Sequence, residues 1–508
     1  MITKELIAQV LRFCACLAAL AAAPAMAAAG DAFSFDTVAE RARAVAARPY
    51  QTPAPTRHTP LLSLTYDQLR DIRFLPSHAV WHAERLPFEL QFFHVGRAFT
   101  HPLEVNEIVN GVSRPLKVAP DAFTYGTAAS AAPPVPELAG FRVHFPINRA
   151  AYKDEVIAFL GASYFRAVAS GQHYGLSARA LAVDTTGGQG EEFPAFVAFW
   201  VERPAADARA MHMYALLDGP RVAGAYRFTI TPGKATVVDV QARLYLRSPV
   251  ATLGIAPLTS MFLSGENQPL PDDFRPEVHD SDGLQIASAD GEWIWRPLQN
   301  PKRTFTTSFA LRGVRGFGLA QRDRRFASYE DTEARYEARP SVWIEAVGDW
   351  GPGRVELMQF YTPDETNDNT VAYWVPERVP APGQPLDIAW RMHWEGDVER
   401  APAAHVVQSR KGRGFADLGP GETQYVVDFA GGALSSLTDE DPVRAVVSAT
   451  GAARVQETNA YRHPVTGGWR MTVRVQRTDM AKPVELRAFL KLGSEVLSET
   501  WSYAISPE

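Results

Sequence analysis

The chain has 508 residues, of which 46% are hydrophobic and 11% aromatic, so it can bury a sizeable core and is too long for one ordinary domain. Its formal net charge is −6, arginine far outnumbers lysine, and like charges never run together for more than a few residues. This mild acidity argues against nucleic acid or an anionic membrane as the partner.

The stretch 1–29 has the pattern of a secretory signal peptide. An early positive charge precedes an apolar run from Val10 to Ala23, and the small residues Ala25 and Ala27 follow it. The run is too short to span a membrane, and no later stretch reaches the roughly 20 apolar residues of a transmembrane helix. Both cysteines lie inside this leader, so we expect a mature chain without disulfides, thiolate nucleophiles or cysteine-ligated zinc.

Helical patterns are few and short. The sequence predicts one helix over 37–48, with Asp36 as its cap, a second over 66–72 after Thr65, and a third over 152–160.

Alternation of apolar and polar residues dominates the rest of the chain. Segments 226–231 and 236–247 alternate on either side of Pro232-Gly233, which predicts a hairpin with one dry face. Further strands are predicted at 193–204, 369–377, 469–479 and 483–492. We therefore predict a mainly β protein built as sandwiches.

A domain boundary is predicted where this alternation stops. Residues 399–418 are rich in proline, glycine and alanine, as a linker is. The linker separates a large β-sandwich domain, 30–398, from 419–508, which has the size of an immunoglobulin-like sandwich. The cysteine–tryptophan signature of that fold is absent, so this label rests on length and strand spacing.

The segment EVHDSDGLQI at 277–286 places His279, Asp280 and Asp282 within four residues. It does not fit an EF-hand, because the glycine comes too early and position twelve of the loop is Gly291. No second histidine cluster accompanies it, so we predict no metal site. A solvated Asx-type turn and one half of a catalytic carboxylate pair both remain open.

A second acidic segment, TPDETNDNTVAYW at 362–374, leads directly into an apolar strand. Its Asp368 is flanked by Glu365, Asn367 and Asn369. Alone, such a segment is more often a turn than a site. A loop at the mouth of a strand, however, is a rigid support on which a sandwich can present a catalytic acid.

Aromatic residues and arginines gather between the two acidic segments. Aromatic faces stack on sugar rings and arginines bond to hydroxyls, so a cleft lined by both, beside two carboxylates, predicts a polysaccharide site. The alternative is that these aromatics are sandwich core. Candidate substrate contacts, besides His279 and the three residues flanking Asp368, are Trp293, Trp295, Arg322, Tyr329, Tyr336, Arg339 and Trp350. The segment 160–185 adds Tyr164, Arg166, Tyr174 and Arg179, as a cleft wall or as internal ion pairs and hydrogen bonds.

Taken in order, these segments resemble the osmoregulated periplasmic glucan biosynthesis proteins of Gram-negative bacteria, the G/D family, and are closer to its G branch. The matching segments run nearly from the mature start to the end: FSFDTVAERARAVAARPY, LTYDQLRDIRF, LGASYFRAVASGQHYGLSARALAVDT, RPEVHDSDGL, GEWIWRPLQNP, GFGLAQRDRRF, GDWGPG and DETNDNTVAYWVPE. The resemblance implies a periplasmic protein with a large sandwich resembling galactose mutarotase and a small immunoglobulin-like domain.

The resemblance also implies an inverting endo-β-1,2-glucanase that acts on glucan after an inner-membrane glucosyltransferase. Asp368 is then the general acid, Asp280 the general base that activates water, and Asp282 the rival base. Inversion requires carboxyl groups about 6.5–9.5 Å apart, or farther apart where a hydroxyl relays the proton. No cofactor is implied. A non-catalytic glucan-binding scaffold, an inverting transglycosylase and, with less support, a mutarotase acting on free sugars are the alternatives.

Overall fold

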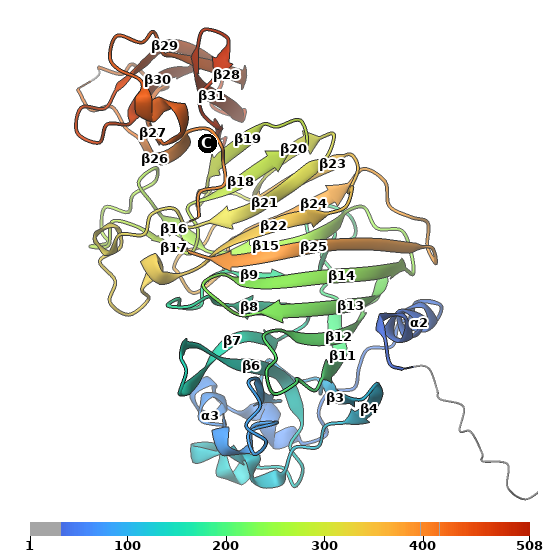
Figure 1. Ribbon diagram of the computed structural model, residues 1–508. Helices are drawn as coiled ribbons and strands as arrows, with labels where there is room; N and C mark the ends of the chain where they lie inside the picture. Colours follow the sequence, from blue (N-terminus) through green and yellow to red (C-terminus); the bar gives the residue numbers. More distant parts are fainter. Residues whose placement is uncertain (1–31, 397, 416, 508) are drawn as a thin grey trace, which may run out of the picture.

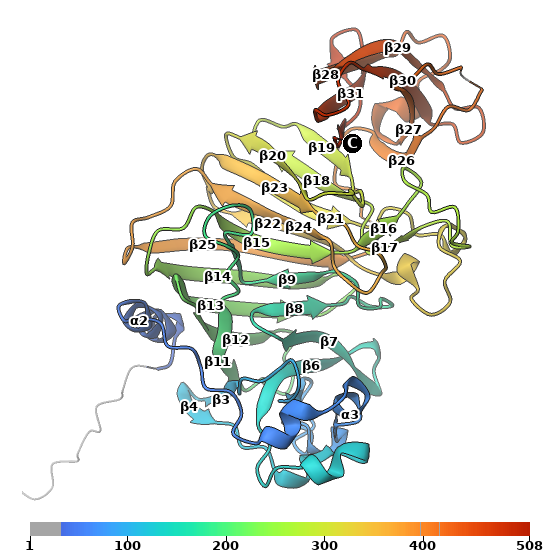
Figure 2. The ribbon, with the colours of Figure 1, turned by 180° about the vertical axis from the view of Figure 1, so that it is seen from behind.

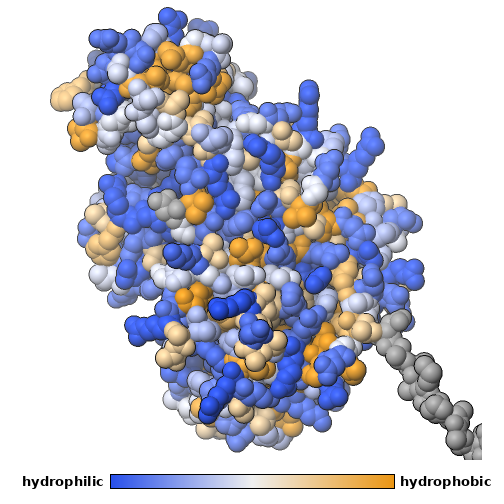
Figure 3. Space-filling model, in the orientation of Figure 1, coloured by the Kyte–Doolittle hydropathy of each residue, from blue (hydrophilic) through white to orange (hydrophobic). Residues whose placement is uncertain are grey.

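The computed structural model describes residues 32–396, 398–415 and 417–507, so the predicted leader lies outside the described residues. The protein is mainly β, as predicted, and two large sheets pack face to face (Figures 1 and 2). Hydrophilic residues dominate the face seen in Figure 3, with hydrophobic residues in small groups between them. No helix in the part of the chain that the structure describes has the length and apolar character needed to cross a bilayer.

The first large sheet has ten strands. Its path is β2 (Glu89–His94), β6 (Leu138–Arg149), β7 (Tyr152–Leu160), β8 (Tyr164–Ala167), β9 (Ser177–Arg179), β15 (Leu253–Ser260), β24 (Thr370–Pro376), β23 (Gly353–Gln359) and β20 (Phe305–Leu311), with β10 (Leu181–Val183) paired to β15.

The second large sheet has fifteen strands. Its path is β28 (Arg444–Gly451), β31 (Val484–Leu492), β33 (Thr500–Ile505), β19 (Trp293–Pro297), β18 (Gly283–Ser288), β21 (Val314–Ala320), β22 (Ser341–Val347), β25 (Pro385–Glu395), β14 (Thr236–Leu246), β13 (Val222–Thr231), β12 (Met211–Asp218), β11 (Ala195–Glu202), β3 (Glu104–Val109) and β4 (Val112–Pro115), with β32 (Glu495–Val496) paired to β31.

In the part of the chain that the structure describes, three smaller sheets, two α-helices and several short 3-10 helices complete the regular structure. The four-stranded sheet is β26 (His405–Lys411), β27 (Glu422–Ala430), β30 (Trp469–Arg477) and β29 (Ala453–Arg462); the ribbons are β1 (Arg73–Phe74) with β5 (Phe123–Thr124), and β16 (Phe262–Ser264) with β17 (Val278–His279); the helices are α2 (Phe35–Ala46) and α3 (Tyr66–Arg70).

The two largest apolar cores among the described residues hold these layers together. Alternate side chains of the two large sheets meet in the first core, which includes the fully buried Trp374 and Trp394. The second core lies under the four-stranded sheet and includes Trp469 and Trp501. The unit around this second core is at the top of Figure 1, and its strand β33 pairs in parallel with β19 of the large sandwich. The predicted linker contains β26, and the division into domains at 399–418 stays a prediction.

Most of the elements predicted from the sequence are confirmed. The hairpin at 226–247 is β13 and β14, and α3 is capped by Thr65, whose hydroxyl accepts the Gln68 N–H at 3.2 Å. Helix α2 begins two residues earlier than predicted and its cap is Ser34 instead of Asp36.

The predicted helix at 152–160 is wrong. These residues form β7, which hydrogen-bonds to β6 on one side and to β8 on the other. Val156, Ile157 and Phe159 are β-branched or aromatic and are buried in the sheet. Sheet pairing on both edges therefore outweighs the helix propensity of the charged residues at the start of this segment.

Candidate active site

The HDSDG segment is buried, so the solvated-turn interpretation is wrong. His279 and Ser281 have no exposed surface, and Asp280 is 4% exposed. Residue 279 ends strand β17, where it pairs with Phe262 of β16. The next amide, that of Asp280, donates to the Met261 carbonyl at 2.8 Å, so two strands fix the backbone on which this carboxylate stands.

The loop that carries Asp368 is tied to the same ribbon. The side chain of Asn369 is fully buried; its Oδ1 accepts the Phe262 N–H at 2.8 Å, and its Nδ2 donates to the carbonyls of Phe262 at 2.9 Å and Phe360 at 3.0 Å. Phe262 pairs with His279. The two acidic segments, far apart in sequence, are therefore joined through one short strand.

Asp280 and Asp368 meet in a group of two carboxylates and two arginines. Asp280 accepts a hydrogen bond from Arg339, and Nη2 of Arg166 lies 3.7 Å from Oδ2 of Asp368. Burial raises the pKa of Asp368, Arg166 opposes this, and the charge of Asp280 raises it further. Burial also raises the pKa of Asp280, while Arg339 opposes it. Each carboxylate thus lies within the electric field of the other.

Asp282 has a different environment from Asp280. It accepts the backbone N–H groups of Arg322 and of Asp323, the latter at 2.9 Å, and it lies 3.3 Å from Nε2 of His279. Burial raises the pKa of its carboxyl, and His279 opposes this. These bonds make Asp282 a support for the chain at 322–323.

His279 is the centre of a buried polar cluster beneath the pair. Nε2 lies 2.9 Å from Glu277 and Nδ1 lies 2.9 Å from Gln321. Burial lowers the pKa of this imidazole, but the charges of Asp282 and Glu277 outweigh it and raise the pKa to about 9. Glu277, His279 and Asp282 offer ligand atoms within 4.8 Å of one another, as a metal site would. Both ring nitrogens already have protein partners, which fits an imidazolium that donates to the Glu277 carboxylate and to the Gln321 amide oxygen.

Sequence analysis missed Arg275, which links the loops around the site. Its guanidinium bonds to both carboxylate oxygens of Glu365, at 3.0 and 2.7 Å, and to Asp331 and Asp273, at 3.0 and 2.8 Å. Glu365 belongs to the Asp368 loop, and Asp331 to the loop that leads to Arg339. The position of Arg275 five residues before Asp280 was the only sequence signal, and its partners are distant in the chain.

Of the remaining predicted contacts near the pair, Tyr329 and Tyr336 are buried in a small apolar cluster. Tyr336 lies under Arg339, whose guanidinium carbon is 4.3 Å from the ring centroid, and the buried Tyr329 donates to the Asp323 carbonyl at 2.9 Å. Tyr174 donates to Glu155 at 3.0 Å. Asn367 is exposed on the Asp368 loop.

Tyr164 and Arg179 stand opposite each other on the neighbouring strands β8 and β9. The Arg179 guanidinium lies 5.5 Å from the Tyr164 ring centroid and bonds to Glu191 at 2.9 Å. Burial raises the pKa of Tyr164, Arg179 opposes this, and both Glu191 and Asp368 raise it further. The Tyr164 hydroxyl therefore lies within reach of the Asp368 charge.

Four predicted substrate contacts have side chains that lie away from the Asp280–Asp368 pair: Trp293, Trp295, Arg322 and Trp350. Trp293 stacks on Trp343 with ring centroids 5.6 Å apart. Trp295 packs in the second core, and Arg322 lies 3.6 Å over its ring while pairing with Glu499 at 2.6 Å. The aromatic richness of this region thus reflects packing as well as the site.

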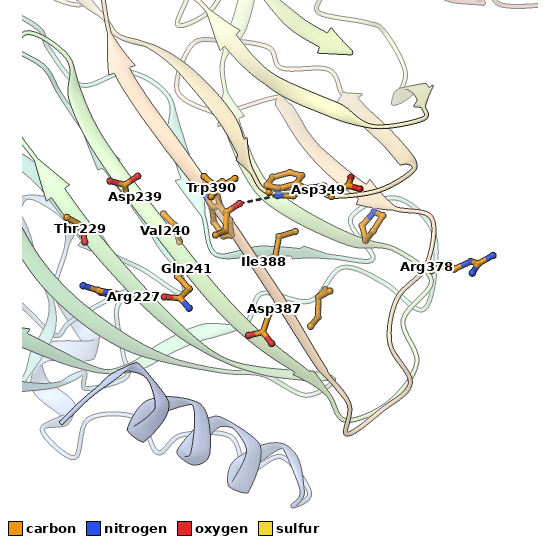
Figure 4. Close-up of a pocket in the computed structure, with 16 residues that line it drawn as sticks. Arg227, Thr229, Asp239, Val240, Gln241, Asp349, Arg378, Asp387, Ile388 and Trp390 are labelled. Carbon is orange, nitrogen blue, oxygen red and sulfur yellow. Dashed lines mark hydrogen bonds between the residues drawn. The ribbon is translucent and has the colours of Figure 1, made fainter. Parts of the chain in front are cut away.

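Trp350 lines a separate pocket of about 560 Å³, drawn in Figure 4. Its indole N–H donates to the Ala389 carbonyl at 3.0 Å. In Figure 4, Asp239 and Gln241 of β14 lie on one side of Trp390, and Asp349 and Arg378 lie on the other. None of the residues that line this pocket belongs to the two acidic segments.

Comparison with known proteins gives one consistent result. Residues 33–505 match the family model described as periplasmic glucan biosynthesis protein, MdoG. The chain is 51% identical to glucans biosynthesis protein G of Ralstonia nicotianae, over 95% of this chain and 98% of that protein. It is 46% identical to the protein of the same name from Pseudomonas aeruginosa, with 93% of each chain covered. The identity to the Pectobacterium atrosepticum protein is 45%, over 93% of this chain and 92% of that one.

Proposed function

The chain belongs to the family of periplasmic glucan biosynthesis proteins, and from this membership we propose that it is an anomer-inverting endo-β-1,2-glucanase that acts in the periplasm. Asp368 is the general acid and Asp280 the general base. The observation that carries the proposal is the pair itself: the buried Asp280 and the partly buried Asp368, which come from separate loops, each beside its own arginine and each in the field of the other.

The environments of the two carboxyls suit these roles. Burial and the nearby negative charge favour a protonated Asp368, which can protonate the glycosidic oxygen as the bond breaks. Burial raises the pKa of Asp280, and the hydrogen bond from Arg339 opposes this rise, which helps the carboxylate to take a proton from the attacking water. Asp282 is less suited to the base role, because backbone N–H groups already bind its carboxylate.

One observation favours the alternative of a glucan-binding scaffold. Asp280 is only 4% exposed and is covered by Arg339, which leaves little access for a water molecule. A protein with this geometry could hold the nascent glucan without cleaving it, and a transglycosylase would likewise exclude water. In each case we assign the glucan cleft to 30–398 and place the protein after the inner-membrane glucosyltransferase.

The test is incubation of the mature protein with linear β-1,2-glucan, with chain length read by chromatography and anomer by NMR. We expect shortened products of α configuration, lost in Asp368→Asn and Asp280→Asn. Asp364→Asn, an exposed carboxylate of the same loop, is the matched control and keeps the activity. Unchanged chain length with retained glucan binding supports the scaffold instead, and rearranged products support transfer.

A further inference from the structure

A second cavity, of about 630 Å³, lies at the edge of the large sandwich where its two sheets approach each other. The ends of β6 and β7 contribute Ala139 and Leu160 from one sheet, and β3 and β11 contribute Glu104 and Ala195 from the other. Residues 50–53 and 98–103 close it. Its volume is in the range of small-ligand sites, about 300–1,000 Å³.

Aromatic rings form the walls of this cavity. Phe193 is 50% exposed, and Tyr50, Phe99 and Tyr164 are partly exposed. Phe99 lies directly over Gly161, where a Cβ would come within 3.1 Å of the ring. Exposed rings gathered in one concave place point to a ligand with apolar faces, since a folded protein normally buries such groups.

The cavity also has a polar lining, as a carbohydrate requires. Thr52, Thr100, His101 and Glu104 lie among the aromatic residues. A sugar ring stacks its C–H face on an aromatic ring and directs its hydroxyls sideways to such groups. A purely hydrophobic ligand would displace water from these polar groups without offering them hydrogen bonds of its own, which is costly.

Tyr164 connects this cavity to the proposed catalytic pair. It lines the cavity, and it lies on the same face of β8 as Arg166, the arginine beside Asp368. The Arg179 guanidinium lies 5.5 Å from the Tyr164 ring and 5.4 Å from the Phe193 ring, so it bridges the two aromatics. A row of neighbouring side chains thus leads from the pair to the cavity, in the order Asp368, Arg166, Tyr164, Arg179 and Phe193.

We propose that this aromatic cavity binds glucose units of the β-1,2-glucan chain that are remote from the bond being cleaved. The inference rests on the proposed function for the identity of the glucan. A distal subsite of this kind raises the affinity only for chains that are long enough to reach it. It therefore sets the minimum chain length for tight binding. Phe193 is the residue that contributes most, because it is 50% exposed, the largest exposed fraction among the aromatic residues that line the cavity.

The test is calorimetric titration of short and long linear β-1,2-glucans, for example of four and about twelve units, into the full mature protein. Every protein carries Asp368→Asn to prevent turnover. The comparison adds Phe193→Ala, Phe193→Trp and, as matched control, Phe415→Ala, another exposed phenylalanine outside the cavity. We expect the long chain to bind more tightly than the short one. Phe193→Ala should weaken only the long chain, by about tenfold, with rescue by Trp.

Two results overturn the distal subsite: equal affinity for both lengths in the protein with native Phe193, or an equal loss for both lengths in Phe193→Ala. Absence of binding at either length in every protein contradicts the glucan assignment itself, and so the proposed function. Length-dependent binding that needs Phe193, in a protein that does not cleave glucan, supports the subsite while the glucanase proposal fails.

Discussion

Asn369 offers a direct test of how the Asp368 loop is positioned. The substitution Asn369→Ala removes a fully buried amide that bonds to three backbone groups of Phe262 and Phe360. Those groups lie inside the protein, where water cannot replace the lost partners. Because Asp368 is the preceding residue, the loop and its carboxylate should both move.

The expected magnitude follows from these three bonds. Each is worth about 1 kcal/mol net, and leaving the partners buried without bonds adds to the cost, so we expect a loss of about 3–5 kcal/mol in the free energy of unfolding. A cooperative unit of several hundred residues has an unfolding entropy on the order of 1 kcal/mol per kelvin near its midpoint. The melting temperature should therefore fall by about 3–5 °C, and glucan cleavage should fall with it.

The assay is thermal unfolding followed by tryptophan fluorescence, with glucan cleavage measured well below the melting temperature. Asn367→Ala is the matched control, because it removes the same amide from the same loop at an exposed position. It should change stability by less than about 0.5 kcal/mol. Equal melting temperatures for Asn369→Ala and the unaltered protein, or equal losses in both variants, would refute this account of the loop.

Three further predictions concern charges. Arg166→Met removes the positive charge 3.7 Å from Asp368, which raises the pKa of that carboxyl, so the alkaline limb of the glucanase pH profile moves to higher pH. The pKa of His279 is about 9 in the folded protein and about 6.5 in an unfolded chain, so it contributes about 3 kcal/mol of stability below pH ~6.5. That contribution is lost as the pH rises through 9, and stability of the His279→Gln variant should lack this decline. Glu499→Gln leaves Arg322 buried without its ion pair and should cost about 3 kcal/mol in urea unfolding.

Each charge variant has a control elsewhere on the protein. Arg378→Met should leave the pH profile unchanged, and His101→Gln should keep the alkaline loss of stability, since both side chains are exposed. Asp479→Asn breaks an exposed pair with Lys482 at 3.4 Å and should cost little. An unshifted alkaline limb in Arg166→Met contradicts Asp368 as the acid. Parallel stability curves for the unaltered protein and His279→Gln contradict the charged imidazole.

The sequence predicted the class of fold because strand patterns are local. Alternation at 226–247 predicts a strand with one buried face, whatever the position of that strand in the sheet. The helix cap at Thr65 depends only on residues of the same helical turn. The segment 152–160 failed for the opposite reason. Its strand state comes from hydrogen bonds to β6 and β8, which no local pattern reports.

The site was predictable in its residue types more than in its contacts. Acidic density marked the two segments as candidates and the family resemblance selected Asp280 and Asp368 within them, but burial of the first is decided by β16 and Arg339 from elsewhere in the chain. Arg275 was missed because an arginine that bonds to three loops looks like any other arginine in sequence. Trp295 was assigned to the cleft because a tryptophan of a core and one of a sugar site have the same local pattern.

The parallel pairing of β33 with β19 has a mechanical consequence. Ile294 stands opposite Thr500 and Trp295 opposite Trp501, so a backbone ladder joins the last strand of the C-terminal unit to the fifteen-stranded sheet. A hinge cannot open there without breaking that ladder, and a force applied to the C-terminal unit is passed to β18, which begins at Gly283, the last residue of the HDSDG segment. A shortened chain lacking β33 would leave β19 as an open sheet edge, ready to pair with a second molecule.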